Sequence, residues 1–208
     1  MFRHRIVSLA ILAACPAAAS AQGSSWALTP ELSLTHHSGV ARDTTSFAGE
    51  PMAGPAPTLM AGLRLERGGD GFRAGLAVHY ARHWVTVRNA SLQVNSPDGW
   101  RLLELAPEGS LPLLRFGRDA ALRAHAGAAA QLWMPTPSGE DNRWTLNALA
   151  ALSAEIPVSA RLATVFRVEG ALGPSVFDPG QLPAEFERRA SVRTRVGVGV
   201  RWRVRSEK

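Results

Sequence analysis

Residues 192–204 have the sequence VRTRVGVGVRWRV. Valine, threonine or tryptophan occupies every second position, and arginine or glycine occupies the positions between them. Because successive side chains of a β-strand point to opposite faces, this period of two predicts a strand with one apolar face. The stretch is longer than the roughly five or six residues usual in a globular strand. It is long enough to cross a membrane, which takes about 9 to 11 residues.

Seven further stretches of the chain alternate in the same way: 28–35, 59–66, 72–81, 101–115, 122–132, 144–156 and 161–172. The stretch 101–115 is the least regular, because Pro107 and Pro112 cannot donate a hydrogen bond to a neighbouring strand. Together with 192–204, the alternation predicts an all-β fold of eight strands.

The connections between these strands alternate strictly between short and long. Turn-forming residues make the short ones, at 68–71, 117–119 and 157–159. The long ones are residues 38–57, 86–100, 134–142 and 174–189. This order is typical of outer-membrane barrels, whose turns face the periplasm and whose loops face outward. We therefore predict one domain, residues 22–208, folded as an eight-stranded antiparallel up-and-down transmembrane barrel.

The N-terminus predicts export. Residues 1–21 combine a short basic head, an apolar stretch and small residues at Ala19 and Ala21, the pattern of a signal peptide cleaved after Ala21. The mature chain then contains no cysteine. The alternative is lipoprotein processing, since residues 12–15 match a lipoprotein box and leave a lipidated Cys15. With the barrel pattern, export predicts an outer-membrane location.

Composition narrows the class of protein. No apolar run beyond the first twenty-odd residues approaches the roughly 18 of a membrane-spanning helix, which excludes a helical membrane protein. The formal charge is +6, or +4 once Arg3 and Arg5 leave with the signal peptide, and for an exported chain this excludes nucleic acid as a partner. Of 23 basic residues only Lys208 is lysine. Arginine suits buried ion pairs, although genomic base composition is an alternative explanation.

The apolar faces of the strands can point outward to lipid or inward as in a soluble barrel. Arginine, glutamate and glycine on the other face suit a narrow packed interior, and the strands are longer than a soluble barrel requires. Aromatic residues also gather near predicted strand ends, as lipid-interface girdles do: Trp26, Phe72, Tyr80, Trp133, Trp144 and Trp202. The alanine-rich faces of 122–132 and 144–156 favour the other orientation. We predict apolar faces outward; the alternative is a soluble exported, lipocalin-like ligand-binding barrel.

In this pattern the chain resembles the small eight-stranded outer-membrane β-barrel proteins of Gram-negative-type bacteria, over nearly all of the mature sequence. The resemblance implies outer-membrane lipid and the barrel-assembly machinery as partners. Such barrels commonly end in an aromatic residue that this machinery recognises, whereas here Trp202 and Val204 are followed by residues 205–208. No peptidoglycan-binding domain follows the barrel, so the resemblance does not imply the anchoring role of larger relatives.

Charged residues on the inward faces predict an ion-paired plug, because unpaired buried charge is costly and an eight-stranded barrel is barely wide enough for its side chains. Arg193, Arg195 and Arg201 are expected to pair with Glu31 and Glu169. The alternative is a narrow anion-preferring pore, since bases outnumber acids. The whole inward set comprises Glu31, Glu66, Glu104, Glu108, Glu155, Glu169, Arg64, Arg73, Arg123, Arg161, Arg167, Arg193, Arg195, Arg201 and Arg203.

One short segment, His36-His37-Ser38, suggests catalysis. A histidine and a serine near the outer rim resemble those of the lipid A deacylases, which implies a lipid-modifying hydrolase with His37 and Ser38 as candidate residues. A nucleophile and its base must lie within hydrogen-bonding distance, and neighbours on alternating faces rarely do. Solvated loop residues are therefore the favoured interpretation, and the hydrolase is the alternative.

The sequence predicts no metal and no cofactor. His79 and His83 share the inward face with His125, but positions four apart on a strand are separated by about 13 Å. No phosphate-binding loop or paired-cysteine motif is present in the mature chain. We therefore predict a non-enzymatic barrel with a structural role, slow passage of small solutes, or contact with an extracellular partner. That contact is expected through the four long loops, 38–57, 86–100, 134–142 and 174–189.

Overall fold

A computed structural model describes residues 25–38, 41–43, 51–88, 93–116, 120–136, 141–177, 184 and 186–204. The predicted signal peptide, the turn 117–119 and the tail 205–208 lie outside the described residues. In the described part of the chain, no helix has the length and apolar character needed to cross a membrane.

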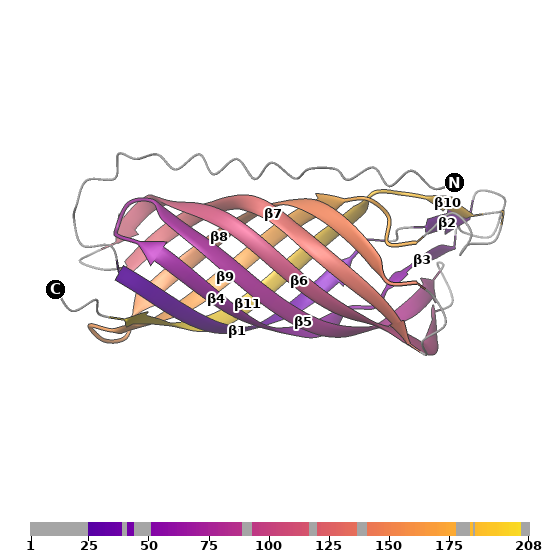
Figure 1. The fold of residues 1–208 in the computed structure, drawn as a ribbon, viewed down its shortest axis with the longest axis horizontal. Helices are drawn as coiled ribbons and strands as arrows, with labels where there is room; N and C mark the ends of the chain where they lie inside the picture. Colours follow the sequence, from indigo (N-terminus) through magenta and orange to yellow (C-terminus); the bar gives the residue numbers. More distant parts are fainter. Residues whose placement is uncertain are drawn as a thin grey trace, which may run out of the picture.

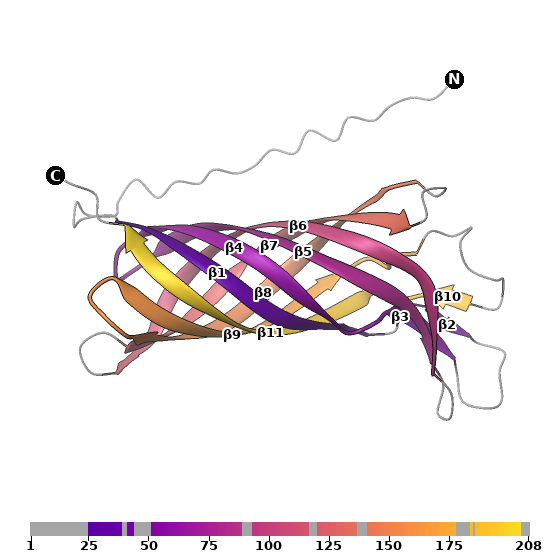
Figure 2. The same ribbon diagram turned by 90° about the horizontal axis from the view of Figure 1, so that it is seen from below.

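Eight long strands form a closed antiparallel ring. Each pairs with the next along the chain, and β1 pairs with β11 from Trp26↔Val204 to His37↔Arg193, which closes the barrel (Figures 1 and 2). The predicted eight-stranded up-and-down barrel is confirmed. The ring strands are β1 Ser25–His37, β4 Thr58–Gly68, β5 Arg73–Arg88, β6 Gln93–Phe116, β7 Ala120–Thr136, β8 Arg143–Pro157, β9 Leu162–Gly173 and β11 Ser191–Val204.

The apolar faces of these strands point outward. Leu34 on β1 and Val196 on β11 are paired and remain 55% and 59% exposed, whereas Arg195, next to Val196, is buried inside. The same alternation holds around the ring, so the outer wall is a continuous apolar surface of the kind that lipid covers. The lipocalin-like alternative is wrong, because it requires these apolar side chains inside.

Three shorter strands lie at one end of the barrel, which we call the outer end: β2 Ala41–Asp43, β3 Met52–Pro55 and β10 Phe186–Arg188 (Figures 1 and 2). β10 pairs with β2, β2 with β3, and β3 with the outer part of β5. The other end, with the tight turns and the described chain ends Ser25 and Val204, is the short-turn end. By the rule for bacterial barrels, the short-turn end faces the periplasm.

The predicted long loops are partly strand. Residues 86–100 were expected to form a loop, but β5 continues to Arg88 and β6 begins at Gln93. The pairing absorbs one irregularity between Trp84 and Val85, which interrupts the strict period of two that the prediction relied on. The predictions for 38–57 and 174–189 also missed β2, β3 and β10, because strands of three or four residues carry too few alternations to detect.

One of the six girdle aromatics was placed wrongly. Trp26, Phe72, Tyr80, Trp144 and Trp202 are exposed on the outer wall, and Arg67 stacks 5.5 Å from the Trp26 ring. Trp133 is only 1% exposed and points into the barrel. The physical reason is strand parity: it lies two positions after the inward Gln131 and therefore shares its face.

Candidate functional site: an ion-paired interior and a cleft in the outer wall

Two arginines of β11 join acids from opposite sides of the barrel. Arg193 donates to Glu104 of β6 and to Glu169 of β9, the latter at 2.8 Å. Arg195 contacts the same two carboxylates at 3.1 and 2.5 Å. All four side chains are buried. Each carboxylate is thus shared between two guanidinium groups, which stabilises charges that would be costly to bury alone.

A second pair of arginines extends this arrangement. Arg64 donates to Glu31 at 3.1 Å and to Glu108. Arg167 donates to Glu108 at 2.6 Å and to Glu169 at 3.0 Å. Glu169 therefore connects the two halves. Four arginines balance four glutamates here, and we call them the central ion network: Glu31, Arg64, Glu104, Glu108, Arg167, Glu169, Arg193 and Arg195.

Two histidines contact carboxylates of the central ion network. His79 lies between Glu31 and Glu104, with Nδ1 3.2 Å from the Glu104 carboxylate. It is paired across β4 and β5 with Gly62, where any Cβ would overlap its ring, so glycine makes the room. His125 Nδ1 lies 3.3 Å from Glu108. Among the described residues, no group of three or more histidine, cysteine or acidic side chains is arranged so that it could hold a metal ion.

A separate charged group lies toward the short-turn end. Arg73 donates to Glu155 at 2.5 Å, and Arg201 donates to Glu66 at 3.1 Å. Arg123 is fully buried but forms no ion pair with any described residue. Its guanidinium donates to the backbone carbonyls of residues 70, 71 and 110 and to the hydroxyl of Ser110. This group therefore contains three arginines and two glutamates, which leaves a surplus of one positive charge.

Of the fifteen charged residues predicted to face inward, fourteen are buried or half-buried. Arg161 is the exception: it is exposed in the turn between β8 and β9, because the chain turns before reaching it. The expected ion pairs were only partly right: Arg201 donates to Glu66, and among the described residues Glu31 pairs with Arg64 and not with an arginine of β11. Arg193 and Arg195 contact Glu169 as predicted. Both reach Glu104, which lies across the barrel on β6 and not on a strand that neighbours β11. The prediction considered neighbouring strands only, whereas a narrow interior also brings opposite walls together.

The outer end of the interior is filled by apolar side chains. Trp100 of β6 packs 5.6 Å from Trp133 of β7 and 5.1 Å from Phe177, measured between ring centroids. Sequence reasoning missed this group, because Val176 and Phe177 follow β9 in a stretch without any strand pattern. We call the group the outer apolar cluster: Ala41, Ala53, Met60, Ala81, Trp100, Leu102, Trp133, Val176 and Phe177.

The side chains of His37 and Ser38, the candidate catalytic pair, are not hydrogen-bonded to each other. His37 is buried at 3% exposure beside His83 and Trp133, and its Nδ1 lies 3.5 Å from the hydroxyl of Ser191. The Ser38 hydroxyl instead accepts the backbone N–H of Val192 at 3.0 Å. Ser38 therefore continues the β1–β11 pairing, and the two side chains are held apart.

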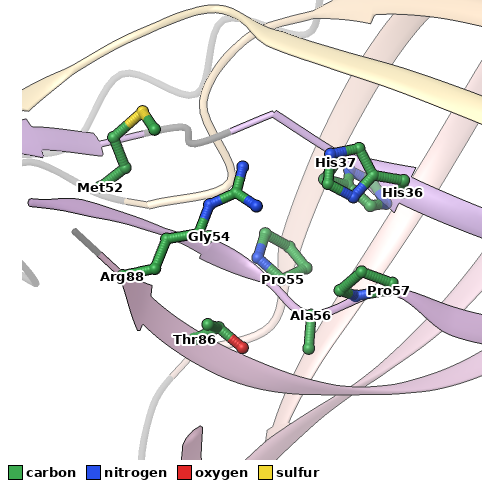
Figure 3. A pocket seen from close by; sticks show the side chains of 9 residues that line it. All are labelled: His36, His37, Met52, Gly54, Pro55, Ala56, Pro57, Thr86 and Arg88. Carbon is green, nitrogen blue, oxygen red and sulfur yellow. The ribbon is translucent and has the colours of Figure 1, made fainter. Parts of the chain in front are cut away.

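A cleft of about 90 Å³ lies in the barrel wall at the outer end, between the last residues of β1 and the segment that joins β3 to β4 (Figure 3). Both His36 and His37 line it. Because consecutive side chains point to opposite faces of a strand, such a cleft reaches from the outer surface toward the interior. We call it the wall cleft: His36, His37, Met52, Gly54, Pro55, Ala56, Pro57, Thr86 and Arg88.

The wall cleft exists because strand pairing changes at this height. β1 and β4 pair up to Thr35↔Thr58 and no further. Beyond that point β3 continues the wall but pairs with β5 and β2, not with β1. Pro55 and Pro57 have no backbone N–H to offer β1. The sequence indicated prolines in a loop here but not a gap in the wall.

No protein-family model matches the sequence, and no curated protein matches it either. Solved structures do match. The crystal structure of Neisserial surface protein A has a TM-score of 0.57 at 10% sequence identity, covering 87% of this chain and 99% of that chain. The solid-state NMR structure of the outer membrane protein AlkL in DMPC bilayers also has a TM-score of 0.57 at 10% identity, covering 90% of this chain and 93% of that chain. At this identity the likeness concerns the fold.

The closed ring, its apolar outer surface and its charged interior define a class of protein, the small outer-membrane β-barrel. The described chain has the eight-stranded form of that fold, which it shares with Neisserial surface protein A and AlkL.

Proposed function

We propose that this outer-membrane barrel is non-enzymatic, does not conduct through its lumen, and acts through its outer end. The central ion network carries the proposal. An eight-stranded barrel is only just wide enough for side chains to fill, and here eight charged side chains cross it in balanced pairs. Ions passing through would have to break several buried salt bridges at once, which is unfavourable.

The outer end offers a surface on which a partner can bind. β2, β3 and β10 extend the sheet beyond the ring at the outer end, where β3 pairs with the outer part of β5 (Figure 2). Paired strands make a firmer surface than open loops do. This supports contact with an extracellular partner through residues 38–57, 86–100, 134–142 and 174–189, in preference to passage of solutes.

Single-channel recording in planar bilayers tests the closed lumen. The wild-type barrel is expected to give no channel events, while a double variant, Glu104→Ala with Arg193→Ala, removes a central pair and is expected to conduct. Arg101→Ala, on the outer face of the same β6 strand, is the matched control and should stay silent. Regular wild-type channel events would contradict the proposal.

Acyl release from lipid A tests the non-enzymatic part. The purified barrel and its His37→Ala variant are both expected to release no more fatty acid than a blank. Release by the wild type that disappears in His37→Ala would overturn the proposal in favour of a lipid hydrolase.

A further inference from the structure

We infer that the wall cleft is a binding site for the phosphate group of an outer-leaflet lipid. Its cation is Arg88. This side chain is half-buried on β5 and lines the cleft, yet it has no hydrogen-bond or ion-pair partner among the described residues. Most other buried arginines of the described barrel meet a carboxylate. An unpaired guanidinium in a cleft presents a planar set of donors that suits a phosphate.

A second polar group of the cleft is also unsatisfied. The His37 ring is buried, and its Nε2 has no hydrogen-bond partner among the described residues. Where the neighbouring Ser191 hydroxyl donates to Nδ1, the hydrogen of a neutral ring resides on Nε2. His37 then offers a donor from β1 while Arg88 offers its donors from β5. Buried polar atoms without partners are rare, and His37 Nε2 is one of them. Together with the half-buried Arg88 guanidinium that lines the same cleft, it points to a missing acceptor.

The height of the cleft indicates that this acceptor belongs to a lipid. His36 comes ten residues after Trp26 on β1. Ten residues of a strand tilted by about 40° rise about 25 Å, which is the height of the apolar band of such barrels. Trp26 is exposed at the short-turn end, where an interfacial aromatic is expected. The cleft therefore lies at the opposite boundary, where lipid headgroups are.

The outward residues around the cleft support the same height. Leu34 of β1 and Leu59 of β4 are paired and exposed, and they belong to the apolar outer surface. The next outward positions toward the outer end are His36 and Pro57, both of which line the cleft. The cleft thus opens where the lipid-facing surface ends. Its remaining lining is largely apolar, through Met52, Pro55 and Ala56, and can contact the carbon atoms next to a phosphate.

Lipid A, a phosphorylated outer-leaflet glycolipid, is the probe for this site. The full barrel in uncharged dodecyl maltoside micelles is titrated with lipid A, and retained lipid is counted by native mass spectrometry. Saturable binding of one lipid is expected. Arg88→Gln should weaken it about tenfold or more, as for a lost charged hydrogen bond. Arg88→Lys keeps the charge without the planar donors and should lose less. Arg101→Gln, an exposed outer-wall arginine outside the cleft, should bind as the wild type does.

Several results would overturn the inference. If Arg88→Gln and Arg101→Gln weaken lipid A binding equally, the lipid is attracted by positive charge anywhere on the outer wall and is not bound in the wall cleft. Equal binding of dephosphorylated lipid A would mean that the phosphate is not recognised. Inorganic phosphate that displaces lipid A at similar concentrations would make the cleft a site for small oxyanions and not for lipid. Each variant is compared only after its unboiled and boiled gel mobilities match those of the folded wild type. None of these outcomes depends on channel recording, so this inference and the proposed function fail separately.

Discussion

The middle of the barrel and its outer end are enclosed by the same strands but filled in opposite ways. On β7, Gln131 donates to Glu104 in the ionic middle, and Trp133, two residues on, packs in the outer apolar cluster. On β6, likewise, Glu104 belongs to the central ion network and Trp100 to the outer apolar cluster. Alternation along each strand therefore decides which residues face inward, while the residues that surround them inside the barrel decide whether charged or apolar side chains fill the space.

The two regions also differ in how they respond to damage. In the central ion network every acid contacts at least two cationic or histidine side chains, so removing one acid leaves the buried network with an excess positive charge. The outer apolar cluster depends on buried area and packing, so removing one ring leaves a cavity, which neighbours partly fill.

The largest effect is expected for Glu104→Ala. The variant leaves Arg193 and Arg195 buried with one shared acid fewer, and the free energy of unfolding should fall by about 4 kcal/mol. Urea unfolding in lipid vesicles, followed by tryptophan fluorescence, measures it. Glu187→Ala, an exposed acid on β10, is the control and should stay within about 0.5 kcal/mol of wild type. A loss below about 1 kcal/mol for Glu104→Ala would show that the network does not stabilise the barrel.

Trp133→Ala should have the next largest effect. The variant opens a cavity beside Trp100 and His37, and the free energy of unfolding should fall by about 3 kcal/mol. Hydrogen exchange should also rise at Val176 and Phe177, which pack in the same cluster, but not at Glu104 and Arg193. Faster exchange in the middle as well would mean that the two regions are a single cooperative unit.

Two arginines near the short-turn end allow the stability contributions of an ion-paired and a non-ion-paired buried arginine to be compared. Arg73→Met leaves Glu155 without its partner and should cost about 2 kcal/mol of unfolding free energy. Arg123→Met removes the surplus charge and breaks no ion pair with a described residue; the carbonyls of residues 70 and 71 that lose a donor are only partly buried. It should therefore cost less than Arg73→Met, about 1 kcal/mol. The same urea titration compares them. A reversed order would show that the surplus charge is compensated from outside the described residues.

The smallest effect is expected for His37→Phe. Its imidazole lies beside aromatic rings, and its Nε2 has no hydrogen-bond partner among the described residues, so an apolar ring of similar shape should change the unfolding free energy by less than about 1 kcal/mol. The same variant should weaken lipid A binding. Strong destabilisation would mean that His37 belongs to the structural core of the outer end and not to the wall cleft.

Much of the fold follows from local geometry. Residues 192–204 form β11 almost as predicted, because alternation along a strand is set by the backbone itself. The same rule places Arg193, Arg195 and Glu169 inside, and it would have placed Trp133 there too. The prediction failed where the period was interrupted, as at the β5 irregularity, or where strands were too short, as in β2 and β3.

The class of fold, the lipid-facing wall and the charged character of the interior follow from the sequence alone, since each depends on which face of a strand a side chain occupies. The tertiary structure was needed to show that Arg193 contacts Glu104 across the barrel, that Phe177 packs in the outer apolar cluster, and that Arg88 lines the wall cleft without a partner among the described residues. These contacts join residues far apart in the chain. They depend on how the ring closes and where strand pairing stops, which no local pattern encodes.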